Sequence, residues 1–329
     1  MVVVISTAQG KLFTDNSDER TASRNSGIFF GMFQSSLLFG SLYSYFMLRN
    51  QSTIDESSRI KLYGGLSAGA FVAVITFLFL RKIPNLRMEE MSEVGTNTRY
   101  NNVCLKSLDG LKDSFMLLKS KEMLIFSVVA IYAGLELTFY SGVYGTCIAQ
   151  NKHFGQGAKG FIGLSGIFIG IGELTGSALV GIFWNILNKL GRDPVIMIGY
   201  LTHVTCFYLI FLNFPGDSPI KDTSAPTYIT SNIAIAMLCS FLLGFGDSCL
   251  NTQIFSILST LFKRNSSSAF AMFGFVRSIA SSAAFYYSGY LLLHWQLFIM
   301  VVVGTCGTFC YIYLEINCAR NYRLGYEEI

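Results

Sequence analysis

The hydrophobic positions of the chain gather into eight long apolar stretches that are separated by polar segments. These stretches cover residues 25–48, 62–80, 123–146, 160–183, 194–213, 232–255, 266–291 and 295–314. Each is close to the roughly 20 apolar residues that an α-helix needs to cross a lipid bilayer. The pattern therefore predicts an all-α multi-pass membrane protein with about eight transmembrane helices, whose surroundings are the lipid bilayer.

Composition supports this prediction and excludes other classes of protein. Of the 329 residues, 52% are hydrophobic and 13% are charged, whereas soluble domains carry about 25% charged residues. A net charge of +4 is too small to favour nucleic acid as a partner. The chain has no nucleotide-binding, hydrolase or zinc-protease motif, and its eight cysteines show no metal-ligand spacing. We therefore predict no enzymatic activity, no metal site and no cofactor.

Lysine and arginine divide unevenly between the two sides that eight helices define. Of the 24 such residues, 17 lie in the N-terminal segment, in the loops after the second, fourth and sixth helices, and in the C-terminal tail. Six lie in the other loops, and Arg277 lies inside a span. Because cytoplasmic loops carry the excess of positive charge, we predict that both termini are cytoplasmic. The pattern does not indicate which membrane holds the protein.

Two parts of the chain resemble each other at an offset of about 243 residues. Residues 7–9 and 25–35 match residues 251–253 and 268–278. Parallel repeats of this kind are typical of transporters. Three helices and most of a fourth precede the match in the second half, whereas almost nothing precedes it in the first half. The chain thus resembles a twelve-helix transporter that lacks its first three helices and most of the fourth.

The repeat divides the chain into four parts. We expect a remnant of an N-terminal bundle over 1–80, a cytoplasmic linker over 81–121, a C-terminal six-helix bundle over 122–314 and a cytoplasmic tail over 315–329. The remnant should hold the end of a fourth helix and the whole fifth and sixth helices. Because alternating access needs two bundles, an inactive truncated isoform is one interpretation of such a chain.

Five runs of residues carry a family likeness. They lie at 17–29, 134–147, 163–173, 244–249 and 291–296, and the longest reads GLELTFYSGVYGTC. Together they resemble the UNC-93-like branch of the major facilitator superfamily over nearly the whole chain, from the fourth helix of that family onward. The resemblance implies a two-bundle fold and a secondary transporter of an unidentified small solute, with proton coupling as one form of it. The alternative is a non-transporting membrane partner that regulates or traffics another membrane protein.

Four charged residues lie well inside predicted spans, and they are Glu136, Glu173, Asp247 and Arg277. A charge at the centre of the bilayer costs about 2.5–3.5 kcal/mol on insertion scales. Such residues therefore usually face a protein interior and take part in function. We expect the four to mark a substrate or proton pathway.

Glu136 is the strongest candidate of the four. Tyr132 and Tyr140 lie at i−4 and i+4 from it and share its helix face, which favours a cavity wall that binds a ligand or a proton. The alternative is a carboxyl group that bonds a neighbouring helix for packing. Because the opposing bundle is largely missing, we expect Glu136 and Asn251 to be more exposed than residues at bilayer depth usually are.

Glu173 is equally consistent with function and with packing. It shares a helix face with Gly166 and Gly170, and small residues at that spacing let helices approach closely. Its carboxyl group could bond a partner across such a crossing. His203 is a lone histidine on the helix over 194–213, and we expect a hydrogen-bonded packing role for it.

Asp247 and Arg277 form a possible buried pair. Asp247 shares a face with Asn251, and the helix that follows it in the sequence carries Arg277. The pair could be a structural clasp or a switch between two states, because buried ion pairs are weak evidence for stability. The family pattern has glutamine in place of Arg277, which favours a local structural pairing.

Overall fold

The structure is a computed structural model of the chain. It describes residues 9–10, 13–15, 17, 21–48, 56–79, 114–155, 158, 160–183, 185–186, 191–263 and 265–323. The first eight residues and most of the predicted cytoplasmic linker, over 81–113, lie outside the described residues. The repeat match at 7–9 and the role of the linker therefore stay predictions.

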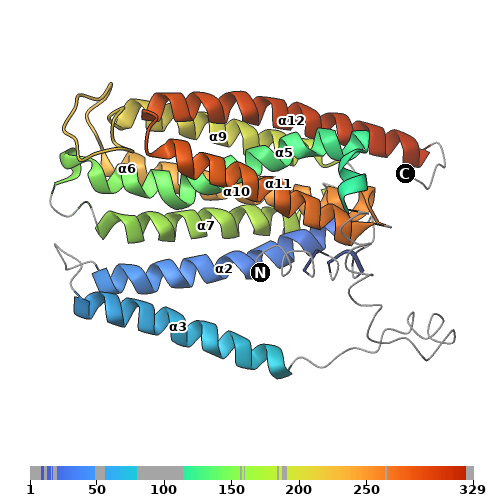
Figure 1. Ribbon diagram of the computed structural model, residues 1–329, viewed down its shortest axis with the longest axis horizontal. Helices are drawn as coiled ribbons and strands as arrows, with labels where there is room; N and C mark the ends of the chain where they lie inside the picture. The colour runs from blue at the N-terminus through green and yellow to red at the C-terminus, as the bar shows by residue number, and fades with distance from the viewer. Residues whose placement is uncertain are drawn as a thin grey trace.

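Every predicted span coincides with a helix in the described part of the chain (Figure 1). The helices are α2 (Ala22–Leu48), α3 (Glu56–Phe79), α5 (Lys121–Thr138), the π-helix η1 (Phe139–Val143), α6 (Tyr144–Gln150), the short 3-10 helix η2 (Lys152–Phe154), α7 (Gly160–Ile182), α9 (Asp193–Asn213), α10 (Ile233–Leu261), α11 (Ser266–Ser288) and α12 (Leu293–Arg323). Among the described residues, six helical segments, all after residue 120, are long and apolar enough to cross a membrane when α5, η1 and α6 are taken as one. This confirms an all-α multi-pass membrane protein, while the count of eight crossings stays a prediction.

Local capping explains where several helices begin. Ser120 accepts a hydrogen bond from the Met123 amide at the start of α5, and Asn232 accepts one from the Ala234 amide at the start of α10. Such side-chain caps satisfy amides that have no partner inside the helix. α9 has proline in its first turn, where the missing amide hydrogen costs nothing.

The C-terminal end of the last helix differs from the prediction. α12 continues to Arg323, whereas the apolar pattern ends the span at residue 314 and begins a tail at 315. The Arg192 guanidinium donates to Glu315 at 3.1 Å, and both side chains are largely buried. This ion pair ties α12 to the start of α9, so the helix remains packed beyond its apolar stretch.

α7 occupies the middle of the helix packing. It lies between α2 on one side and α10 on the other (Figure 1). α5 packs against α11 and α12, and α9 packs against α10 and α12. α2 is therefore held by the C-terminal bundle, whereas the side chains described for α3 are exposed apart from the half-buried Leu62.

A cluster of phenylalanine rings joins the N-terminal segment to the bundle. The ring centroid of Phe255 on α10 lies 4.7 Å from that of Phe30 on α2, 6.1 Å from that of Phe13 and 5.0 Å from that of Phe270 on α11. Aromatic pairs at these separations add about 0.5–1.5 kcal/mol beyond the burial of their surface. The cluster therefore helps to fix α2 against α10 at this end of the bundle.

A π-helical turn interrupts the span that the sequence predicts over 123–146. It covers Phe139–Val143 and begins three residues after Glu136. A single π-helical turn inside an α-helix is frequent at functional sites. The Thr138 hydroxyl, just before this turn, lies 3.3 Å from the Ser281 carbonyl oxygen of α11 and 3.1 Å from that of Gly134.

The loop between α9 and α10 is anchored to the end of α6. The Thr223 amide donates to the Gln150 carbonyl at 2.9 Å, and the Lys152 amide donates to the Thr223 carbonyl at 2.9 Å. Thr223 is buried by these contacts, whereas the side chain of Lys221 in the same loop is 69% exposed. Lys221 is therefore the better position for a chemical label in this loop.

We predict that the linker at 81–121 and the α9–α10 loop lie on opposite sides of the membrane, because of the charge distribution. Single cysteines in place of Ser92 and Lys221 should react with a membrane-impermeant maleimide from opposite sides of sealed vesicles. The parent chain gives the background from its own cysteines. Labelling of both positions from one side would contradict the predicted orientation.

Candidate functional site

The α7–α10 crossing joins the helices that carry Glu173 and Asp247. The Ser165 and Ser240 hydroxyl oxygens lie 2.8 Å apart across it, and those of Ser177 and Ser248 lie 2.7 Å apart. A Cβ atom on Gly244 would overlap the Ile169 carbonyl oxygen. Because small residues let two backbones touch, side chains at this crossing share a narrow, enclosed space.

Glu136 of α5 and Asp247 of α10 are neighbours inside the bundle. Both residues have 0% exposure. Their carboxyl groups are close enough to repel each other electrostatically, although neither carboxylate oxygen of Glu136 has a hydrogen-bond partner among the described residues. Two buried carboxylates in contact rarely ionise together, since burial and mutual repulsion both oppose the second charge. The pair is therefore a candidate proton-binding site.

Asp247 is bonded to two amide side chains. Gln34 of α2 donates to Asp247 Oδ2 at 3.4 Å, and Asn251 donates to Asp247 Oδ1 at 2.7 Å and to the Asp247 carbonyl at 3.1 Å. The expected ion pair with Arg277 does not form among the described residues. The reason is the packing, because α11 lies against α5 rather than bringing Arg277 onto Asp247.

Arg277 is instead placed beside an aromatic ring. Its guanidinium carbon lies 5.8 Å from the centroid of the Phe273 ring, an arrangement in which the ring face attracts the cation. Its Nε atom is buried and has no hydrogen-bond partner. The Arg277 charge still acts electrostatically on Glu136 and Tyr140.

Glu173 is the third buried acid. It has 0% exposure, and neither of its carboxylate oxygens has a hydrogen-bond partner. It lies within electrostatic range of Asp247 and Glu136. Among the described residues, Glu173 therefore has no hydrogen-bond partner across the helix crossing, which the packing alternative requires.

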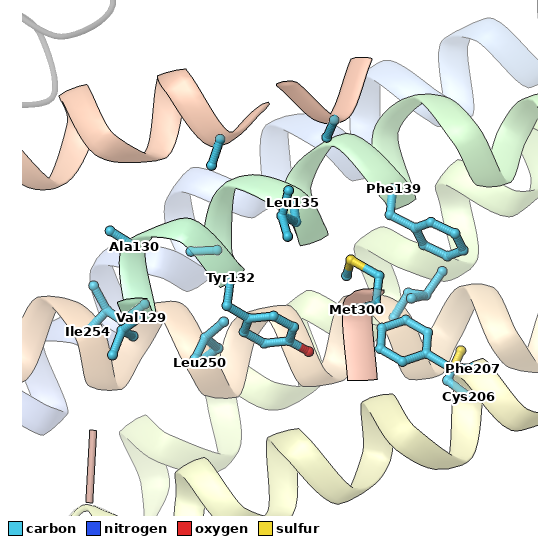
Figure 2. Close-up of a cluster of buried hydrophobic side chains, with 14 of the residues drawn as sticks. Val129, Ala130, Tyr132, Leu135, Phe139, Cys206, Phe207, Leu250, Ile254 and Met300 are labelled. Atoms are coloured by element: carbon cyan, nitrogen blue, oxygen red, sulfur yellow. The ribbon is translucent and has the colours of Figure 1, made fainter. Parts of the chain in front are cut away.

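The two predicted tyrosines have different surroundings. Tyr132 is buried within a cluster of apolar side chains, and Figure 2 shows its hydroxyl oxygen directed toward Phe207 of α9. That hydroxyl oxygen lies 2.7 Å from His203 Nδ1. Tyr140 is half-buried in the π-helical turn, within electrostatic range of all three acids. Tyr132 thus contacts His203 through its hydroxyl group, and both tyrosines lie within electrostatic range of Glu136 and Asp247.

Sequence reasoning missed two residues of this site. His203 Nε2 lies 3.6 Å from Glu136 Oε1, so His203 is a neighbour of the acid pair as well as a packing residue. The second residue is Gln34, whose side-chain amide makes the hydrogen bond that links α2 to Asp247. Its position opposite Arg277 in the repeat was the available signal.

The expected exposure of the site is wrong. Glu136 has 0% exposure and Asn251 has 2%, although both were expected on an open wall. α2 covers this region from one side with Gln34, and α9 covers it from the other with His203. A separate pocket of about 580 Å³ lies elsewhere, at the α9–α10 loop, and its lining includes Phe211, Tyr228 and His294.

Comparisons with known proteins agree with this architecture. The family model described as "Ion channel regulatory protein UNC-93" matches residues 2–312. UNC93-like protein MFSD11 of Xenopus laevis is 44% identical over 322 residues, which is 95% of this chain and 72% of that protein. The Xenopus tropicalis protein of the same name is 42% identical, over 97% and 73% of the two chains. Protein unc-93 homolog A of Homo sapiens is 22% identical, over 90% and 65%. The family resemblance is thereby confirmed, and the chain belongs to the UNC-93 family, which is related to the major facilitator superfamily.

Proposed function

We propose that this membrane protein is a proton-coupled secondary transporter, with Glu136 and Asp247 as its proton site. The observation that supports the proposal is that Glu136 of α5 and Asp247 of α10 are both fully buried and lie within electrostatic range of each other. No lysine or arginine among the described residues forms an ion pair with either acid. A proton is the smallest partner that removes the repulsion between them.

The bonds of Asp247 suggest how a bound proton would change the conformation. An ionised Asp247 accepts hydrogen bonds from Gln34 and Asn251, and bonds to a charged acceptor are roughly twice as strong as those to a neutral one. Protonation of the pair would therefore weaken the contact between α2 and α10. Such a change would link the occupancy of the proton site to the relative position of the two helices.

The proposed substrate is a small solute that binds near the acid pair. Three groups near the acid pair favour a particular chemistry. The Glu173 carboxylate and the Asn251 Oδ1 atom are buried acceptors without partners, and Tyr140 presents a half-buried hydroxyl. An acceptor-rich site favours a solute that donates hydrogen bonds or carries positive charge.

A second function, regulation of another membrane protein without transport, is favoured by one observation. The matching family is described as ion channel regulatory. The side chains described for α3 are almost all exposed, with Tyr63, Phe71 and Val72 among the large apolar ones. A helix with so little contact inside the chain has a surface on which a membrane-protein partner could pack.

Reconstitution into sealed vesicles tests the transport proposal. Vesicles that contain the purified chain and a pH-sensitive dye would be exposed to fractions of a small-molecule cell extract. We expect at least one fraction to drive a saturable proton flux, and Glu136→Gln to reduce that flux to the level of empty vesicles. The matched control is Glu56→Gln, because Glu56 is an exposed acid in the first turn of α3.

Two outcomes would count against the proposal. Solute-driven proton flux that survives in Glu136→Gln would remove Glu136 from the coupling. The absence of flux with every fraction, together with altered membrane currents in oocytes that express the chain, would support the regulatory function instead.

A further inference from the structure

We propose that His203 is a positioning residue for the proton site, and that it reaches Glu136 through a gap that Gly246 leaves in α10. The inference rests on the proposed function, because it assigns His203 a role at the same acid pair. It goes beyond that proposal by naming a residue from a helix that carries none of the three acids.

His203 makes three polar contacts from α9. Its Nδ1 atom lies 2.7 Å from the Tyr132 hydroxyl oxygen. Its Nε2 atom lies 3.3 Å from the Leu243 carbonyl oxygen and 3.6 Å from Glu136 Oε1. The imidazole is 1% exposed. Both ring nitrogens are therefore engaged inside the protein.

Gly246 makes this position of the imidazole possible. A Cβ atom on Gly246 would overlap His203 Cδ2 and Nε2. Any other residue at that position of α10 would push the ring away from α10 and from Glu136. Gly304 of α12 leaves space for the Tyr132 ring in the same way, since a Cβ atom on Gly304 would lie 2.8 Å from Tyr132 Cε2. The Tyr132–His203 pair thus occupies space that two glycines leave open.

The hydrogen bonds fix which nitrogen carries the proton in the neutral ring. The Leu243 carbonyl can only accept, so Nε2 carries the hydrogen and Nδ1 accepts from the Tyr132 hydroxyl. The Nε2–H group then lies between the Leu243 carbonyl and Glu136, where its positive end stabilises charge on the carboxylate. Asp247 acts on the same ring electrostatically from α10, and Phe207 stacks on it with ring centroids 5.7 Å apart.

Infrared spectroscopy of the purified chain in lipid nanodiscs tests the inference without a transport assay. The carboxyl and carboxylate bands of Glu136 are assigned by their loss in Glu136→Gln. In His203→Gln the amide nitrogen takes the place of Nε2, and in His203→Asn it takes the place of Nδ1. We expect the Glu136 bands to keep their frequency in His203→Gln and to shift in His203→Asn.

Two glycine substitutions extend the test to the gap in α10. Gly246→Ala should shift the Glu136 bands in the same direction as His203→Asn, because it displaces the ring. The control is Gly199→Ala at the same α9–α10 crossing, where the added Cβ atom would lie 2.9 Å from the Cys249 Cβ atom and does not meet the imidazole. Thermal unfolding in detergent shows whether each variant is folded. If Gly246→Ala does not fold, the comparison of His203→Gln with His203→Asn still tests the inference.

The results separate this inference from the proposed function. Equal band positions in His203→Gln and His203→Asn would overturn the positioning role. If Glu136 shows only carboxylate bands over the whole accessible pH range, the proposed proton site is wrong. In that case the contact with His203 is still tested, because the carboxylate bands of Glu136 should differ between His203→Gln and His203→Asn.

Discussion

Replacing Gly244 with alanine is expected to destabilise the protein strongly, because the added methyl group would overlap the Ile169 carbonyl oxygen on α7. Overpacking of a well-packed interior costs about 1–3 kcal/mol and occasionally more. The upper end is expected here, since the obstacle is a backbone atom that cannot rotate away. A Cβ atom added at Gly172, at the same crossing, would likewise overlap the Phe241 carbonyl oxygen. Thermal unfolding followed by size-exclusion chromatography in detergent measures the loss.

Gly69→Ala is the matched control for this prediction. Gly69 lies inside α3, and a Cβ atom there would meet nothing within 4 Å. Alanine is favoured over glycine inside a helix by roughly 0.5–1 kcal/mol, so this variant should be neutral or slightly more stable. If both variants unfold at the parent temperature, α7 and α10 do not touch as closely as the structure shows.

Replacing Glu173 with methionine is expected to raise the stability of the fold. Both carboxylate oxygens of Glu173 are buried without a hydrogen-bond partner. Leaving such a group unsatisfied costs about 1–3 kcal/mol, and more when it is charged. Methionine has a similar length and adapts to irregular space. We therefore expect a higher unfolding temperature, measured in detergent against Glu56→Met, which changes an exposed acid and should have little effect.

A lower unfolding temperature for Glu173→Met would have the opposite meaning. It would show that Glu173 bonds a partner in the folded protein, as the packing interpretation of the sequence allows. A stabilised variant, in contrast, would indicate that the acid is kept for function, because functional sites often cost stability.

The positions of the helices could be predicted from the sequence, because the length of an apolar stretch is a strong and local signal. Their ends were less predictable. α12 extends to Arg323, and its part beyond the apolar stretch holds Glu315, which pairs with Arg192 more than a hundred positions earlier. The π-helical turn after Glu136 could not be predicted either, because the search for apolar spans treats each helix as having one constant period.

The candidate site was predictable in its acids and less so in its partners. Glu136, Glu173 and Asp247 are all buried, as is usual for acids inside predicted spans, whereas the proximity of Glu136 to Asp247 was not predicted. The pairing of Asp247 with Arg277 was wrong, because helices that follow each other in sequence need not present those two side chains to each other. His203 was underestimated, because its reach to Glu136 depends on the missing side chain of Gly246 on a different helix.

The π-helical turn at Phe139–Val143 gives this span an unusual tolerance to a change in its length. A π-turn holds one residue more than an α-helical turn. Loss of one residue there would leave a regular α-helix in which α5 and α6 keep the faces that they now present to their neighbours. The same loss within α5 would rotate the remainder of the helix by about 100° and would carry Tyr132 or Glu136 away from α9 and α10.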